Sequence, residues 1–221
     1  NADLPKEYCD EHQIHLLPLN VHIEGNDLLD KYSIQTQQFY DKLNSYTSHP
    51  KTSSPSTLVI EQKLRPLTEK YEHVIVLSLA QALSSTHDAI KHVATKIPNV
   101  HVINSKCCSG AQGLLLMEMV AAIEAQQSLE KVLARAATCI SKTQFCFMIN
   151  DLSALIRSGR INKIIGKMAQ LSGLKPIFAL NAEGKTHLVN RAFNEKAAMQ
   201  KILQQVKARI KKGEKLKSYC L

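Results

Sequence analysis

The chain has 221 residues, of which 44% are hydrophobic, 5% are aromatic and none is Trp. This composition supports a substantial buried core in one or two domains, and it argues against a base-stacking platform for nucleic acid. The net charge is +9, with 9 Lys/Arg against 12 Asp/Glu in residues 1–100 and 19 against 7 in residues 101–221. The basic second half favours an acidic partner or ligand, or else it forms solvated helix faces.

Six cysteines lack the spacing of a disulfide framework and contain no C-x-x-C zinc pair, which favours a reducing, cytoplasmic setting. They are Cys9, Cys107, Cys108, Cys139, Cys146 and Cys220. His12, His15 and His22 do not have metal-ligand spacing with carboxylates, so no metal site is predicted. The sequence contains no run of about 18 uncharged apolar residues, so no transmembrane segment is predicted.

Apolar periodicity and turn signals predict alternating strands and helices. The first part is predicted to hold a helix over Lys6–Gln13, a strand over Ile14–Ile23, a turn over Glu24–Asn26, a helix after Ser33 and a loop over Ser45–Ser56. Next come a helix over Thr57–Lys70, strands over Val74–Leu79 and Val100–Ile103, and helices over Thr86–Lys96, Gly110–Gln127 and Leu129–Ser141. Pro66 is expected to end or kink the first of these helices.

The pattern changes near Phe145. The predicted elements are strands over Phe145–Ile149, Lys175–Leu180 and His187–Asn190, and helices over Asp151–Arg157, Ile161–Leu171 and Asn194–Lys212. Glu183-Gly184 is typical of a hairpin turn. The predicted fold is α/β, with a parallel-sheet, three-layer N-terminal domain over residues 1–145 and a second α/β domain with a mixed or antiparallel sheet over residues 146–221.

Two hydroxyl-rich turns, Lys51-Thr-Ser-Ser-Pro-Ser56 and Leu83-Ser-Ser-Thr86, are the most informative feature. Ligands of parallel α/β sheets bind at the carboxyl ends of the strands, where Ala80–Thr86 is expected to lie. Hydroxyl and backbone N–H groups there can hold a carboxylate or a phosphate. Thr52 and Ser84 are also good helix caps, which is the alternative interpretation.

Arg157 and Arg160 flank Gly159 and suit two-point recognition of a phosphate or carboxylate, unless they are solvated loop charges. Cys107 and Cys108 precede a predicted helix, where a thiolate is stabilised, but a structural role is favoured because nothing in the sequence places a base beside them. No residue is predicted to be catalytic.

The order and spacing of several motifs resemble the DegV, or EDD-domain, family of bacterial fatty-acid-binding proteins. Lys51-Thr-Ser-Ser-Pro-Ser56 is similar to Lys-Thr-Ser-Gln-Pro-Ser, and Leu83-Ser-Ser-Thr86 is similar to Leu-Ser-Gly-Thr. Arg157-Ser-Gly-Arg-Ile161 resembles an Arg-x-Gly-Arg-Ile loop, and Lys175-Pro176 resembles the Lys-Pro that follows it. Ala2-Asp-Leu-Pro5 and Leu17-Pro-Leu-Asn20 match the opening and the second-strand motif.

The resemblance implies a non-enzymatic protein that holds a long-chain fatty acid between two domains and presents it to a partner fatty-acid kinase, which forms an acyl-phosphate for phospholipid synthesis. No cofactor, nucleic acid or metal is implied. Thr52 and Ser84 would hold the carboxylate. The full set of predicted ligand-binding residues is Thr52, Ser53, Ser84, Gln81, Thr86, Arg157 and Arg160.

The sequence departs from the family pattern in three ways. Ala80-Gln81 stands where the family usually has Ser-Ser, so a hydroxyl contact is lost or the Gln81 amide replaces it. Ser85 replaces the Gly of Leu-Ser-Gly-Thr. The family's first strand and last stretch have no counterpart, so the second domain is expected to be truncated.

Two other functions are compatible with parts of the sequence. The strand-end hydroxyls suit an enzyme or binding protein for a small phosphorylated metabolite, although neither G-x-G-x-x-G nor G-x-x-x-x-G-K-[ST] is present. The basic half suits nucleic acid, but it lacks an aromatic or helix-turn-helix signature.

Overall fold

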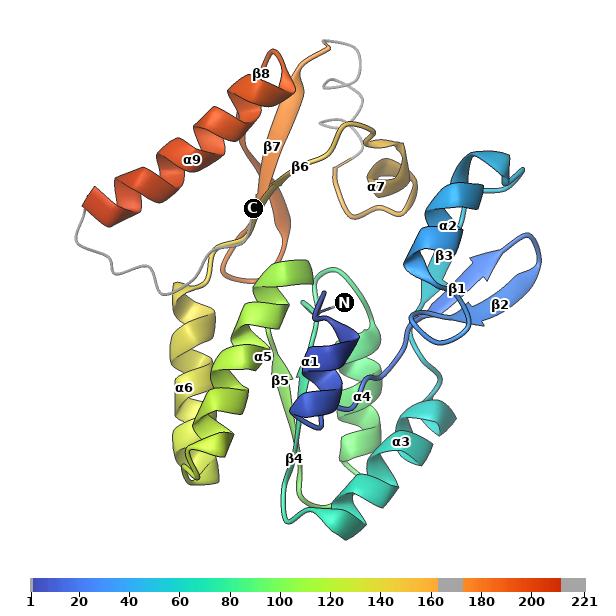
Figure 1. Cartoon of the computed structure of the whole chain (residues 1–221), viewed down its shortest axis with the longest axis vertical. Coiled ribbons are helices and arrows are strands. Elements are labelled where there is room, and N and C mark those ends of the chain that lie inside the picture. Colours follow the sequence, from blue (N-terminus) through green and yellow to red (C-terminus); the bar gives the residue numbers. More distant parts are fainter. Residues whose placement is uncertain (1, 163–172, 212–221) are drawn as a thin grey trace. The chain divides into compact units, whose positions relative to one another are not determined.

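The computed structural model describes residues 2–162 and 173–211 (Figure 1). The chain divides into two compact units, which are considered separately below. The first unit comprises Leu4–Asn104, and the second comprises residues 1–3 and 105–221. The division at residue 145 that the sequence suggests stays a prediction.

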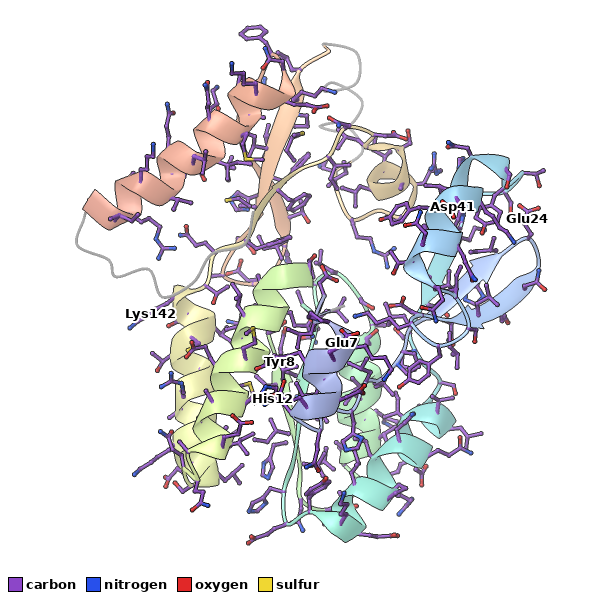
Figure 2. The ribbon with its side chains drawn as sticks, viewed as in Figure 1. Glu7, Tyr8, His12, Glu24, Asp41 and Lys142 are labelled. Carbon is purple, nitrogen blue, oxygen red and sulfur yellow. The ribbon has the colours of Figure 1, made fainter. Side chains whose placement is uncertain are left out.

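A small antiparallel sheet in the first unit contains β1 (Asn20–Ile23), β2 (Asn26–Leu29) and β3 (Lys51–Ser53), in the order β2-β1-β3. Glu24 and Gly25 have φ values of 50° and 77°, the left-handed conformation that a tight two-residue hairpin turn requires. Figure 2 shows Glu24 at this end of the hairpin. The short helices of this region are α1 (Lys6–Glu11), α2 (Thr36–Lys42) and the 3₁₀ helix η1 (Leu43–Ser45).

Two sequence predictions about this sheet are wrong. The strand predicted over Ile14–Ile23 forms only over its last four residues, and Pro18, which has no N–H to donate, lies in the part that does not pair. The segment Ser45–Ser56 was expected to be loop throughout, but it contains β3. Pairing with β1 decides the conformation of this Ser- and Thr-rich segment against its local turn preference.

The larger part of the first unit is a parallel α/β element. β4 (Val74–Ser78) and β5 (Val100–Asn104) pair in parallel, and α3 (Thr57–Lys70) and α4 (Thr86–Ala94) pack beside them (Figure 1). The core joins α3, α4 and β4 through Ile60, Leu64, Val74, Ile90, Val93 and Ile97, and the partly buried Val100 and Val102 of β5 pack against it. Because β4 and β5 pair in parallel, the predicted parallel arrangement is confirmed.

α3 has the predicted bounds but continues through Pro66. The expectation that this proline ends the helix is therefore wrong. Ile60 and Leu64 are buried, and Leu67, beyond the proline, packs against the same core. The burial of this apolar face offsets the cost of an interior proline.

The second unit combines a helix pair with an antiparallel sheet. α5 (Ser109–Glu124) packs on α6 (Leu129–Lys142), with Arg135 and Glu118 forming an ion pair at 2.5 Å. The sheet has the order β6-β7-β8 and contains β6 (Cys146–Met148), β7 (Lys175–Leu180) and β8 (Thr186–Ala192). Within the described residues, the other helices of this unit are α7 (Ser153–Arg157) and α9 (Glu195–Lys211).

The hairpin predicted at Glu183-Gly184 is confirmed, because β7 and β8 are antiparallel and the Asn181 side chain accepts from the backbone N–H groups of Glu183 and Lys185. The predicted helix over Ile161–Leu171 falls almost entirely outside the described residues. An α/β fold with a parallel sheet in the first part and an antiparallel sheet in the second agrees with the sequence prediction.

Candidate ligand-binding site

The two hydroxyl-rich turns of the sequence meet in the first unit. Ser54, just after β3, lies with its Oγ 2.8 Å from Ser85 Oγ and 3.1 Å from Thr86 Oγ1. Ser84 Oγ lies 2.9 Å from Thr86 Oγ1. Ser54, Ser84, Ser85 and Thr86 therefore form one hydroxyl cluster, although 30 or so residues separate its two halves in the sequence.

Counting the hydroxyl hydrogens shows which residue donates in most bonds of this cluster. Each hydroxyl has one hydrogen to donate. Thr86 donates to Ser54, so Ser84 must donate in its bond to Thr86. In the third bond, either Ser54 or Ser85 is the donor. Four hydrogens serve three bonds, so one hydrogen at the Ser54–Ser85 end is available to a ligand oxygen.

Solvent exposure of these hydroxyl residues increases from Thr86 toward Ser85. Thr86 is buried, Ser84 and Ser54 are half-buried, and Ser85 is exposed. The available hydrogen therefore lies at the accessible end of the cluster. A chain of hydroxyls that ends in an exposed donor suits an anionic oxygen, because each bond in such a chain polarises the next.

Thr52 and Ser53 are adjacent in β3, but their side chains lie on opposite faces of the sheet. Thr52 pairs with Val21, and Ser53 pairs with Asn20, so strand alternation directs the two hydroxyls to opposite faces of the sheet. Ser53 Oγ lies 2.8 Å from His22 Nε2 and accepts from Asn20 Nδ2 at 3.3 Å. Thr52 lies in a strand, so the interpretation of this residue as a helix cap is wrong.

The cap of α3 is Ser56, whose Oγ accepts from the Val59 N–H at 3.3 Å. Ser84 Oγ accepts a hydrogen bond from the Thr86 N–H at 3.3 Å. Ser84 therefore stabilises the turn into α4 and also belongs to the hydroxyl cluster. The N-cap residue of α4 is Ser85, so Ser84 is not the cap itself, and its contact with a ligand stays a prediction.

Gln81 is held by other polar side chains. Its Nε2 donates to Asp88 Oδ1 at 2.7 Å, and its backbone N–H donates to Asn104 Oδ1 at 3.3 Å. These contacts tie the loop after β4 to the end of β5. The amide nitrogen has two hydrogens, so the suggested use of the Gln81 amide in place of a lost hydroxyl can draw on the hydrogen that does not bond Asp88.

A buried histidine, His87, lies next to the cluster in the chain and bonds to the end of β4. His87, directly after Thr86, has its Nδ1 2.8 Å from Ser78 Oγ at the end of β4. Ser78 Oγ also donates to the Ile103 carbonyl at 3.3 Å. Burial lowers the pKa of His87, so the neutral imidazole is favoured there.

Arg157 and Arg160 belong to the second unit. α7 ends at Arg157, and Gly159 follows with φ of 74°, as expected for the glycine that stops a helix. Both arginines are exposed, and Arg160 Nη1 donates to the Ser158 carbonyl at 2.7 Å. They form a separate basic group on the loop that the sequence singles out.

The cysteines before α5 favour the structural interpretation. Burial raises the pKa of both Cys107 and Cys108 to about 11, which opposes the thiolate that nucleophilic chemistry needs. Among the described residues, no group of three or more His, Cys, Asp or Glu side chains is placed to hold a metal ion. Across residues 2–162 and 173–211, no helix has both the length and the apolar character needed to cross a bilayer.

Ser54 and Ser85 belong to the cluster but are not among the ligand-binding residues predicted from the sequence. Both lie inside the two hydroxyl-rich motifs, Ser85 at the position where the family motif has Gly. The available signal was the number of adjacent hydroxyls in each turn, since residues next to a predicted contact are natural partners for it.

The fold and this cluster define an α/β protein with a polar site at the carboxyl edge of a parallel strand pair. A family model described as "Uncharacterised protein, DegV family" matches residues 1–221, and the chain belongs to that family. A DegV domain-containing protein of Clostridium acetobutylicum is 26% identical over 206 residues, covering 92% of this chain and 73% of the relative.

Solved structures agree with this assignment. The structure described as fatty acid binding of a DegV family protein from Thermus thermophilus is 29% identical, has a TM-score of 0.85, and is matched over 94% of this chain and 74% of its own. A fat acid (stearic acid)-binding protein from Eubacterium ventriosum has a TM-score of 0.87 at 23% identity, with 96% and 75% covered. The second likeness supports the fold alone.

Proposed function

We propose that the chain binds a long-chain fatty acid without transforming it and that its hydroxyl cluster receives the carboxylate. The observation that carries the proposal is the meeting of Ser54 with Ser85 and Thr86, which joins both motif turns in one polar site. The fatty-acid binding described for the Thermus thermophilus relative supports the choice of ligand. Thr52 and Ser84 remain the proposed carboxylate contacts, with Ser54 and Ser85 added to them.

The acyl tail and the carboxylate head contribute different amounts to the binding free energy. Burying an acyl chain yields about 0.8 kcal/mol per CH₂, so a long chain supplies on the order of 10 kcal/mol before ordering costs. A hydrogen bond to a charged carboxylate adds about 1.5–3 kcal/mol. The tail therefore sets the affinity, and the hydroxyls set the orientation and the preference for an acid head.

The binding proposal is tested by extracting lipid from the purified protein and identifying it by mass spectrometry. Co-purified fatty acid at near-stoichiometric yield is the expected result. A protein that carries no acyl chain and fails to take up octadecanoic acid would contradict it. The double variant Thr52→Ala with Ser84→Ala then tests the residues, because unchanged preference for acid over alcohol would remove them from the role.

A finer part of the proposal concerns the partner. The bound acid would be presented to a fatty-acid kinase in the cytoplasm, and the exposed Arg157 and Arg160 would meet the phosphate or the kinase. Trapping the acyl-phosphate with hydroxylamine, in a mixture with ATP and a bacterial fatty-acid kinase, measures this step. Replacing both arginines with Ser is expected to lower the hydroxamate formed per bound fatty acid. An unchanged yield would exclude the arginines.

A further inference from the structure

A second polar constellation lies on one face of the small sheet, on the side opposite Thr52. His22 on β1 is paired directly with Asp27 on β2, and Asn20 on β1 is paired directly with Ser53 on β3. Directly paired residues, and residues two apart on a strand, share a face. The register therefore places all four side chains together, and the tight β1–β2 turn fixes that register.

The contacts order three of these residues into a line. Asp27 Oδ1 is in close contact with His22 Nδ1, and His22 Nε2 lies 2.8 Å from Ser53 Oγ. An ionised carboxylate can only accept, so Nδ1 carries the hydrogen. In the neutral ring, Nε2 is then the acceptor, and Ser53 must donate to it. Ser53 is thus a hydroxyl whose proton points at a base that a carboxylate orients.

This geometry suits a nucleophile better than a carboxylate ligand. A Ser53 hydrogen committed to His22 is not available to an anionic head group, whereas the oxygen lone pairs can attack an acyl carbon. All three side chains are accessible: Ser53 is exposed, and the His22 and Asp27 side chains are 38% and 79% exposed. A substrate can therefore reach the line from solvent.

Asn20 completes the chemical set. Its Nδ2 donates to Ser53 Oγ at 3.3 Å and to the Ser54 carbonyl at 3.0 Å. When Oγ bonds to an acyl carbon, the negative charge forms on the carbonyl oxygen of that carbon, and the Nδ2 hydrogen that bonds Oγ can turn to this oxygen. A side-chain amide in that position stabilises the developing charge. Leu29 pairs with Asn20 on the same face and is 36% exposed, which gives an acyl group an apolar neighbour.

We propose that Ser53 is an acyl-accepting nucleophile that acts on uncharged carboxylic esters, with His22 as its base, Asp27 orienting the imidazole and Asn20 as oxyanion donor. Ser53 Oγ bonds to the ester carbon while its proton passes to His22 Nε2. The bond from carbon to the alkoxy oxygen breaks, and that proton leaves with the alcohol. Water then attacks acyl-Ser53 and gives a proton to His22, which returns it to Ser53 Oγ as the acid departs.

The inference stands apart from fatty-acid binding, since it uses other side chains and an ester instead of an acid. Its test is hydrolysis of p-nitrophenyl octanoate and p-nitrophenyl acetate by the whole chain, together with labelling by a fluorophosphonate and peptide mass spectrometry. A label on Ser53 and saturable hydrolysis are expected. A label on another residue, or none at millimolar probe, would overturn the proposal.

Variants assign the roles. Ser53→Ala is expected to abolish labelling, and His22→Gln to reduce hydrolysis by about 10²- to 10⁴-fold, the range for a lost general base. Asp27→Asn should lower kcat with little change in KM, because Asp27 acts through His22. Ser45→Ala, an exposed hydroxyl that donates to the Lys42 carbonyl, is the matched control. Hydrolysis by Ser53→Ala at the unaltered rate would reject the nucleophile, and labelling of the unaltered chain gives the same decision if that variant does not fold.

Discussion

The Oγ atoms of Ser54 and Ser85 lie 2.8 Å apart, one just after β3 and the other just before α4. Ser85 stands where the motif it resembles has Gly, so this chain adds a hydroxyl at that place. The same chain has Ala80 and Gln81 where the pattern has two serines. The polar group gained at Ser85 lies in the cluster that we propose binds the acid head.

Ser54→Ala is expected to weaken fatty-acid binding by about tenfold, because a hydrogen bond to a charged group is worth about 1.5 kcal/mol or more. The loss arises because Ser85 and Thr86 each lose the bond to Ser54, so the two turns are no longer connected through this residue. Isothermal titration with octadecanoic acid measures it, and octadecan-1-ol tests the head group. A variant whose acid and alcohol affinities fall equally would indicate general damage to the fold.

Glu24 is expected to control the order of the adjacent segment in a pH-dependent way. Its carboxylate accepts from the Ser48 N–H at 2.8 Å and from the Ser48 and Thr47 hydroxyls at 3.0 Å, and these bonds lower its pKa from 4.5. A depressed carboxyl pKa contributes stability above the ordinary value, and this is lost as pH falls through the folded value.

The Ser48 amide proton resonance should therefore titrate with a midpoint below 4.5. The variant Glu24→Gln, which has no carboxylate to protonate, should lose that titration. A resonance that is insensitive to pH in the unaltered chain would contradict the hydrogen-bonded arrangement.

His87 is expected to make the first unit less stable in mild acid. Burial lowers its pKa from the ordinary 6.5, opposed by Asp88 and assisted by Lys91. Below that value the unfolded chain takes up a proton that the folded chain resists, so stability falls as pH drops below about 6.5 and is full above it. His87→Asn, which keeps a donor toward Ser78, should flatten the dependence. Urea unfolding at about pH 8 and about pH 5 measures the free energy of unfolding at each pH. An equal change in this free energy between the two pH values for both proteins would exclude His87 as the cause.

Cys107 and Cys108 are expected to resist alkylation in the folded chain. Burial raises each pKa to about 11, so at about pH 8 only about one thiol in a thousand is ionised. Iodoacetamide labelling with peptide mass spectrometry should show slow modification that rises steadily with pH. The urea-unfolded chain provides the control, since all its cysteines should react at similar rates. Rapid labelling of Cys107 at neutral pH would contradict the burial.

Periodicity in the sequence predicts the parallel half well. α3 has the predicted bounds because Ile60 and Leu64 are spaced for one buried helical face, and β4 is a continuous apolar run flanked by turns. β3 escaped prediction because three residues rich in hydroxyls carry no strand period, and only pairing with β1 orders them. Local pattern therefore finds elements with a buried face and misses those that a neighbour organises.

The same distinction applies to the candidate sites. The motifs identified the two hydroxyl turns, but which hydroxyl touches which depends on packing between distant segments, so Ser54 was missed. The pairing of His22 with Asp27 was within reach of the sequence, because a two-residue turn at Glu24-Gly25 dictates it. The contact to Ser53 was not, since it needs the third strand.

Thr52 and Ser53 are neighbours in the chain, yet the pleat of β3 turns them toward different surroundings. Mutational tolerance at the two positions should therefore be uncoupled, with each residue answering to its own set of neighbours. Substitutions on one face of this short strand can therefore accumulate without changing the other face. A second activity can arise at Ser53 while the role of Thr52 is kept.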